Sequence, residues 1–248
     1  MLLKTDAVVL KQKKFGEGDA VITLFSKKLG KLQAVAKGFK RPRGKYSVGT
    51  QPFCYGEFVL FKGKELYQIS QVDLKQSFYK LREDVIKLTY ASYILELTES
   101  IITEGQTNNR LFTLLIEYLH IFSKMNKEYE TLTKAYELKS LMYSGFKPQI
   151  ESCVHCGSLG SENVKFSARE GGILCSNCLS EDPYSMKISR VTINVMQYLM
   201  YADLAQIARF KIKPYVLKEL EKIVKHYINI HIEKSKFKSL QFLEAVKK

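Results

Sequence analysis

Two Cys-x-x-Cys pairs constrain this chain more than any other feature of its sequence. Cys153 and Cys156 form the first pair, and Cys175 and Cys178 follow after eighteen intervening residues. Each pair aims two thiolates at one point, and two pairs complete the tetrahedral shell that Zn²⁺ prefers. We therefore predict one Zn²⁺ bound by these four cysteines. The site is expected to be structural, because four thiolates leave no open coordination position for chemistry.

The residues between the two pairs predict a hairpin. Residues 164–169 and 173–174 have strand composition, and Gly171-Gly172 can form the turn between them, so the segment is expected to be a zinc ribbon. Two disulfides are the first alternative, disfavoured because the N-terminus lacks a signal-peptide core and cytosolic thiols stay reduced. A redox site is the second, but such a motif usually occurs once. His155 could replace one cysteine, although inside the knuckle it is expected to face solvent.

The first 76 residues predict a small β-barrel. Five β-branched and aromatic stretches occur in about 70 residues, with one long loop between the third and the fourth. They begin near Ala7, Val21, Leu32, Phe53 and Leu66. This pattern fits a five-stranded OB fold, and an SH3-like barrel is the alternative, since strand count alone does not separate the two.

From Ser77 the hydrophobic period changes to that of helices. Helical patterns run from about residue 81, from Asn108 or Asn109, from Glu128 to Ser144, from Ser189 or Thr192, over 202–211 and from Pro214. Gly145 is expected to end the third of them as a left-handed C′ residue. We therefore predict an α+β multidomain chain: an OB fold over 1–76, a helical domain over 77–150 and 183–248, and the zinc ribbon inserted over 151–182.

The charge of the chain is unevenly distributed. The formal net charge is +14, and residues 1–80 carry 16 lysines and arginines against 6 acidic residues, whereas residues 81–180 carry 10 against 12. A basic N-terminal unit beside a near-neutral middle favours a polyanion, and specifically nucleic acid, as its partner. The alternative is a solvated lysine-rich surface.

The long loop of the barrel is the sharpest candidate for that contact. It combines cations that neutralise phosphates with rings on which bases stack. The predicted DNA contacts there are Lys37, Phe39, Lys40, Arg41, Arg43, Lys45 and Tyr46, and Lys28 and Lys31 at another strand turn extend the track. A solvated loop tip is again the alternative.

Motifs for catalysis and membrane insertion are missing from the sequence. The four histidines form no spaced ligand set, and no phosphate-binding or nucleophile motif occurs. No apolar run approaches the length of a membrane span. We therefore expect a non-enzymatic protein of the cytoplasm, without a membrane partner.

Several short motifs, in order along nearly the whole chain, resemble the RecO family of bacterial recombination mediators. They are Gly16-Glu17-Gly18-Asp19, Ala36-Lys37-Gly38, Gln51-Pro52-Phe53, Gly145-Phe146-Lys147-Pro148, the two cysteine pairs, Phe166-Ser167, Gly171-Gly172 and Lys238-Ser239-Leu240. The family's zinc cysteines are not universal among its members, and here all four are present.

The resemblance implies an OB fold, a helical domain and a zinc-binding insertion. It also implies a DNA repair function associated with the nucleoid: binding of single- and double-stranded DNA, annealing of complementary strands, and loading of RecA together with RecR on strands coated by the single-strand-binding protein SSB. An SSB tail that ends in acidic and apolar groups needs an apolar groove edged by cations, for which Arg110, Lys134 and Lys139 are candidates.

Two other readings remain open. An RNA-binding OB/zinc-ribbon protein of translation or ribosome assembly would use the same barrel chemistry and would depend on the 2′-hydroxyl. A structural adaptor would bind proteins through its helices, and its charge would be incidental.

Overall fold

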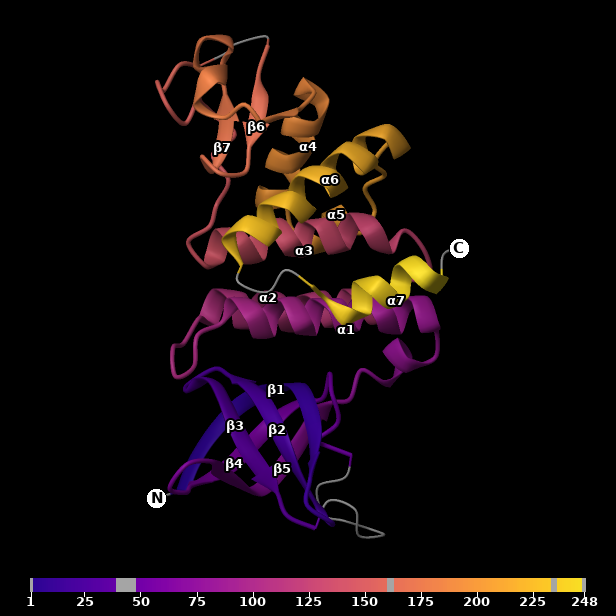
Figure 1. The fold of residues 1–248 in the computed structure, drawn as a ribbon. Coiled ribbons are helices and arrows are strands. Elements are labelled where there is room, and N and C mark those ends of the chain that lie inside the picture. Colours follow the sequence, from indigo (N-terminus) through magenta and orange to yellow (C-terminus); the bar gives the residue numbers. More distant parts are fainter. Residues whose placement is uncertain (1, 39–47, 160–162, 233–235, 247–248) are drawn as a thin grey trace. The chain divides into compact units, whose positions relative to one another are not determined.

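The computed structural model describes residues 2–38, 48–159, 163–232 and 236–246 (Figure 1). The chain forms two compact units, of which the first contains residues Met1–Lys124 and Lys238–Lys248 and the second Met125–Phe237. Each unit has its own buried core. Among the described helices, none is long and apolar enough to cross a membrane.

Five strands of the first unit close into a barrel in the order β1-β2-β3-β5-β4. They are β1 (Leu2–Phe15), β2 (Asp19–Ser26), β3 (Gly30–Ala36), β4 (Tyr55–Lys62) and β5 (Tyr67–Gln76). Neighbours pair antiparallel, except that β3 and β5 pair in parallel through Ala34–Tyr67 and Val35–Gln68. This strand order is that of an OB fold. The predicted OB fold is therefore confirmed, and the SH3-like alternative is not adopted.

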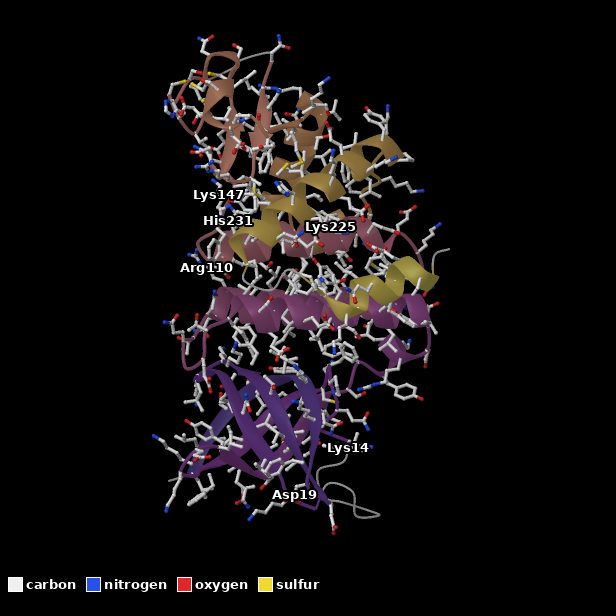
Figure 2. All side chains as sticks on the ribbon, in the orientation of Figure 1. Lys14, Asp19, Arg110, Lys147, Lys225 and His231 are labelled. Atoms are coloured by element: carbon white, nitrogen blue, oxygen red, sulfur yellow. The ribbon has the colours of Figure 1, made fainter. Side chains whose placement is uncertain are left out.

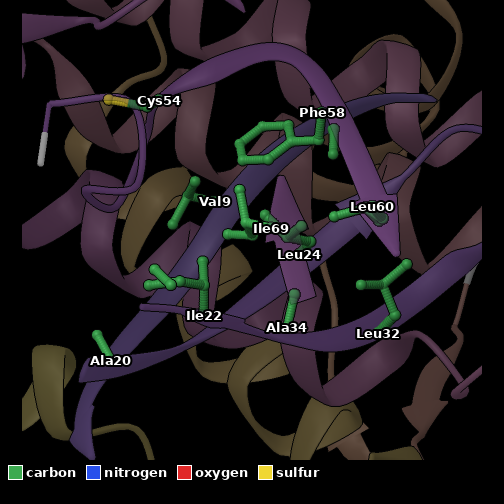
Figure 3. Close-up of a cluster of buried hydrophobic side chains, with 12 residues drawn as sticks. Val9, Ala20, Ile22, Leu24, Leu32, Ala34, Cys54, Phe58, Leu60 and Ile69 are labelled. Carbon is green, nitrogen blue, oxygen red and sulfur yellow. The ribbon is translucent and has the colours of Figure 1, made fainter. Parts of the chain in front are cut away.

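The barrel is filled by the apolar side chains that alternate along its strands. Ala20, Ile22 and Leu24 of β2 point inward at every second position, and Phe58 and Leu60 of β4 meet them (Figure 3). All five are completely buried. Because side chains of a strand alternate between its two faces, the outward positions remain free for polar contacts and for a covering helix.

Helices cover part of the barrel's outer surface. After a short 3₁₀ turn, η1 (Tyr79–Arg82), come α1 (Val85–Ile101) and α2 (Asn109–Lys124), and α7 (Lys238–Val246) packs on α1. Asp84 caps α1 by accepting from the Lys87 amide at 2.6 Å. Phe112 of α2 meets Phe25 of β2 edge to face, with 5.4 Å between ring centroids, so α2 lies against the outside of the barrel.

The second unit combines helices with a small sheet. It contains α3 (Tyr129–Tyr143), β6 (Lys165–Ser167), β7 (Gly172–Leu174), the 3₁₀ helix η2 (Ser176–Glu181), β8 (Met186–Lys187), α4 (Arg190–Tyr201), α5 (Leu204–Ile207) and α6 (Pro214–His231). The sheet order is β7-β6-β8. The predicted hairpin is thus confirmed, with β8 as an additional third strand.

The local signals for helix ends were correct. Ser189 caps α4, accepting from the Thr192 amide at 3.2 Å, and Pro214 occupies the start of α6. Gly145 follows α3 with φ +88°, and the Phe146 amide bonds the Leu141 carbonyl at 2.8 Å. The helix predicted over 202–211 is shorter, since only Leu204–Ile207 are α-helical.

Candidate metal centre and nucleic-acid interface

The four predicted cysteines meet at one point in the second unit. Their sulfur atoms all lie within 4.8 Å of one another, and the Sγ atoms of Cys156 and Cys175 are 3.6 Å apart. None of the cysteines is in a disulfide. A tetrahedral Zn²⁺ site with Zn–S bonds of about 2.3 Å places its sulfurs about 3.8 Å apart. The observed cluster fits that shell, so the four cysteines could hold one metal ion.

Hydrogen bonds around the cluster favour the thiolate at Cys153 and at Cys156. The Cys175 amide donates to the Cys153 sulfur at 3.4 Å, and this bond with those from the amides of Cys156 and His155 opposes the effect of burial, lowering the pKa of Cys153. Ser158 donates to Cys156 and lowers the pKa of that thiol to about 6. Burial raises the pKa of Cys178 to about 12. Four thiolates cannot form close together without a cation, so the donor set is suited to a divalent metal.

The surroundings of the four cysteines are typical of a structural metal site. Cys153, Cys175 and Cys178 are buried and pack with Leu174 of β7, and Cys156 is exposed. His155 is exposed and directed to Glu181 at 3.7 Å, as expected for a knuckle residue facing solvent. A metal ion bound here would cross-link the two knuckles. Four protein ligands would fill its coordination shell and leave no open position for a substrate.

The tip of the β1–β2 hairpin forms a second cluster, in the first unit. Lys13, Lys14 and Phe15 are exposed at the end of β1, and Phe15 is 54% accessible. Figure 2 labels Lys14 near the end of β1 and Asp19 at the start of β2. The Asp19 carboxylate accepts a hydrogen bond from the Gly38 amide at 2.8 Å. This bond connects the hairpin to the residue that precedes the long basic loop. Two cations and an aromatic ring therefore lie beside the start of that loop.

The predicted DNA contacts fall into three groups. Phe39, Lys40, Arg41, Arg43, Lys45 and Tyr46 lie outside the described residues. Lys37 is exposed and lies at the start of the loop, directly after β3. Lys28 and Lys31 lie at the other end of β3, and the Lys31 ammonium donates to the Glu99 carbonyl at 3.0 Å. The structure therefore separates Lys28 and Lys31 from Lys37.

The candidates for an SSB-tail contact differ in accessibility. Arg110 is exposed on the first turn of α2, in the first unit. Lys134 and Lys139 belong to α3 of the second unit, where Lys134 pairs with Glu137 at 2.8 Å. Lys139 is 5% accessible and donates to the Met200 carbonyl at 3.0 Å.

Sequence analysis did not single out Lys13, Lys14 and Phe15 as contacts for DNA. A usable signal was present, because two adjacent lysines precede an aromatic residue and the Gly16-Glu17-Gly18-Asp19 turn. Connecting segments lie on the surface of a protein, so a charged and aromatic strand end that leads into a turn is expected to be exposed.

The chain combines an OB-fold barrel that has a basic end with helices and a four-cysteine cluster. These features define a class of multidomain proteins, and their barrel is of a type that commonly binds nucleic acid. Residues 1–78 match the family model "Recombination protein O N terminal", and residues 82–241 match "Recombination protein O C terminal". The chain therefore belongs to the RecO family of DNA repair proteins.

Full-length relatives agree with this assignment. The chain is 45% identical to the DNA repair protein RecO of Alkaliphilus metalliredigens, with 99% of this chain and 100% of the relative covered. It is 36% identical to that of Acetivibrio thermocellus, covering 98% and 97%, and 35% identical to that of Desulforamulus reducens, covering 100% and 96%.

Proposed function

We propose that this protein is a DNA-binding recombination mediator. It binds single- and double-stranded DNA, anneals complementary strands without ATP and, with RecR, helps to load RecA onto strands coated by SSB. Membership of the RecO family and the basic barrel support this proposal. The observation that carries it is the Asp19–Gly38 bond, which joins the exposed Lys13, Lys14 and Phe15 to the start of the loop.

The chemistry of this surface fits sequence-independent binding. Lysine ammonium groups neutralise phosphates and release counterions, and an exposed ring offers a stacking surface to any base. Annealing requires two polyanions to approach each other, and clustered cations lower the cost of that approach without base contacts. We therefore assign the hairpin tip, Lys37 and the loop that follows it to the DNA contact.

The metal centre has a separate part in this proposal. We infer that Zn²⁺ occupies the four cysteines and stabilises the ribbon, without taking part in a reaction. The cysteines belong to the second unit and the basic hairpin to the first. DNA affinity and metal content should therefore be separable by mutation.

Recognition of SSB is assigned to a cation beside an apolar helix face. The ammonium groups of Lys134 and Lys139 already have partners within the protein. Arg110 is exposed and has no ion-pair partner among the described residues. Arg110 is therefore the first residue to test for binding of the acidic tail.

Binding to single-stranded DNA, duplex DNA and RNA of matched sequence, measured across a salt series, tests the function. We expect DNA binding that weakens steadily with salt and has no requirement for a 2′-hydroxyl. Selective binding of RNA would support a role in translation instead, and absence of binding at physiological salt would overturn the proposal.

A further inference from the structure

A cleft in the first unit lies at the other end of the barrel from the hairpin tip. It has a volume of about 480 Å³, and its basic lining consists of Lys4, Lys27, Lys28 and Lys75. Lys4 belongs to the beginning of β1 and Phe15 to its end, so the cleft and the hairpin tip are separated by roughly 30 Å of strand. The cleft is therefore a different surface from the one assigned to DNA above.

The charges of this cleft are not balanced within the protein. Lys4 pairs with Glu57 at 2.8 Å, and Lys75 pairs with Asp6 at 2.6 Å. The Lys28 ammonium donates to the neutral Lys4 carbonyl at 3.2 Å and has no ion-pair partner in the part of the chain that the structure describes. Among the described residues, Lys27 has no ion-pair partner. Two cations of the cleft are thus left for an anion.

The turn that carries these two cations is held in place by its backbone. The Lys27 amide donates to the Asp6 carbonyl at 2.9 Å, and the Lys28 amide donates to the Thr5 hydroxyl at 3.3 Å. The Thr5 and Ser26 hydroxyls are themselves 2.8 Å apart in a buried pair. A fixed turn loses little backbone entropy when it binds a ligand, so the positions from which the two lysine side chains extend are preorganised.

The segment that leads into α2 is fixed over the same turn. Gly30 has φ +67°, and a Cβ on it would lie 2.1 Å from the Gln106 carbonyl oxygen, so only glycine permits this close approach. The Gly105 amide also donates to the Lys31 carbonyl at 3.1 Å. As a result Thr107, which precedes α2, and Asn109, which begins it, also line the cleft.

A second cleft of about 450 Å³ continues from the first, and Asp6 and Lys27 line both. Its surface is largely apolar, with contributions from Tyr55, Phe112 and Ile116, and Glu117 and Asp6 add carboxylates. The Tyr55 and Phe112 rings lie edge to face with 6.3 Å between centroids. Each cleft is within the range of about 300–1,000 Å³ that is typical of small-molecule sites.

We propose that the joined clefts bind one nucleotide of a second nucleic-acid strand, with its phosphate at Lys27 and Lys28 and its base over Tyr55 and Ile116. The Glu117 carboxylate suits the exocyclic amino group of a base, whereas it would repel an acidic peptide side chain entering the same half. This inference rests on the proposed function and deepens it, because a barrel with two strand contacts can hold both partners of an annealing reaction.

Photo-cross-linking tests this assignment. The probe is a single-stranded oligonucleotide with one 5-iodouracil, applied to the full chain, and the cross-linked peptides are identified by mass spectrometry. We expect a cross-link on the peptide that contains Tyr55. The K27Q/K28Q variant loses two phosphate contacts, and each contact contributes about 0.7 to the slope of log affinity against log salt. Over the one log unit between 1 M and 0.1 M salt this amounts to about 25-fold, so the Tyr55 cross-link at 0.1 M salt should weaken by about that factor. Glutamine retains both backbone bonds of the turn, and the melting temperature checks that the variant is folded.

The matched control is K13Q/K14Q, which removes two cations from the hairpin tip. It should weaken total DNA binding but leave the Tyr55 cross-link in place. If the wild type binds DNA and cross-links only at the hairpin end, the second strand contact is wrong and the proposed function stands. If the wild type binds no DNA at all, the proposed function fails first. A Tyr55 cross-link that is unaffected by K27Q/K28Q would also overturn the assignment. So would binding in the cleft of a peptide with acidic and apolar side chains that the oligonucleotide does not displace.

Discussion

The Asp19 carboxylate accepts a hydrogen bond of 2.8 Å from the Gly38 amide, which lies nineteen positions further along the sequence. Gly38 has φ +66°, a conformation that glycine adopts without strain. The bond therefore connects two short motifs, Gly16-Glu17-Gly18-Asp19 and Ala36-Lys37-Gly38, that are far apart in the sequence. It gives a physical reason for the presence of Asp19 beside a surface that carries Lys13 and Lys14.

Replacement of Asp19 by alanine is expected to weaken DNA binding severalfold. The substitution removes a negative charge beside the DNA surface, so electrostatics alone would strengthen binding. Loss of the Gly38 bond acts in the opposite direction, because the start of the loop is no longer positioned. D19N is the control, since its amide oxygen can still accept the bond. Tighter binding by D19A, measured by fluorescence anisotropy, would show that Asp19 has no positioning role.

Metal content provides the second prediction. One Zn²⁺ per chain is expected in reduced protein, and Cys175→Ser should abolish its binding and unfold the ribbon locally. Single-strand affinity should remain near that of the wild type, because the hairpin surface belongs to the other compact unit. Cys54→Ser is the control, since Cys54 lies in the barrel core and outside the cluster. Elemental analysis that finds no zinc in wild-type protein would contradict this prediction.

The parts of the fold that could be predicted are those specified locally. The cysteine spacing, the Ser189 cap and the Gly145 helix end each depend on a few neighbouring residues, and all three appear as expected. The return of α7 to α1 depends on contacts between residues far apart in the chain, and no local signal indicates it. The cleft at Lys27 was missed for the same reason, because it needs β1, the β2–β3 turn and α2 together.

Tyr227 provides a pH-dependent prediction for the second unit. Burial against Phe166 and His231 raises the pKa of Tyr227 to about 12. In the unfolded chain a tyrosine has a pKa of about 10, so between pH 10 and 12 the native state binds more protons. Stability is thus fully present below pH 10 and falls as pH rises to 12, by up to about 2 kcal/mol from this residue. Chemical denaturation of Y227F should show a smaller loss over this range than the wild type does.

The salt dependence of DNA binding tests the loop and the hairpin tip together. Replacement of four loop cations by glutamate should weaken binding to every DNA sequence; the four are Lys40, Arg41, Arg43 and Lys45. The slope of log affinity against log salt should also fall, by about 0.7 for each single-strand contact that is lost. K13Q/K14Q should reduce the slope in the same direction and by a smaller amount. Glutamines at Lys222 and Lys225, exposed on α6, are the control and should leave the slope unchanged. An unchanged slope in the loop variant would place the DNA elsewhere.

Annealing of SSB-coated strands tests the mediator mechanism as a whole. The sequence contains no nucleotide-binding motif, so complementary oligonucleotides should anneal at the same rate with and without ATP. Removal of the SSB tail should slow annealing of coated strands but not of bare ones, because in the proposed mechanism the tail delivers the protein to its substrate. Arg110→Glu should reproduce the effect of tail removal by placing a like charge where the tail carboxylates bind, whereas Arg110→Lys should retain most of the activity. If R110E anneals coated strands as fast as the wild type, the tail binds elsewhere. If bare strands require ATP, the protein is not a passive annealing mediator.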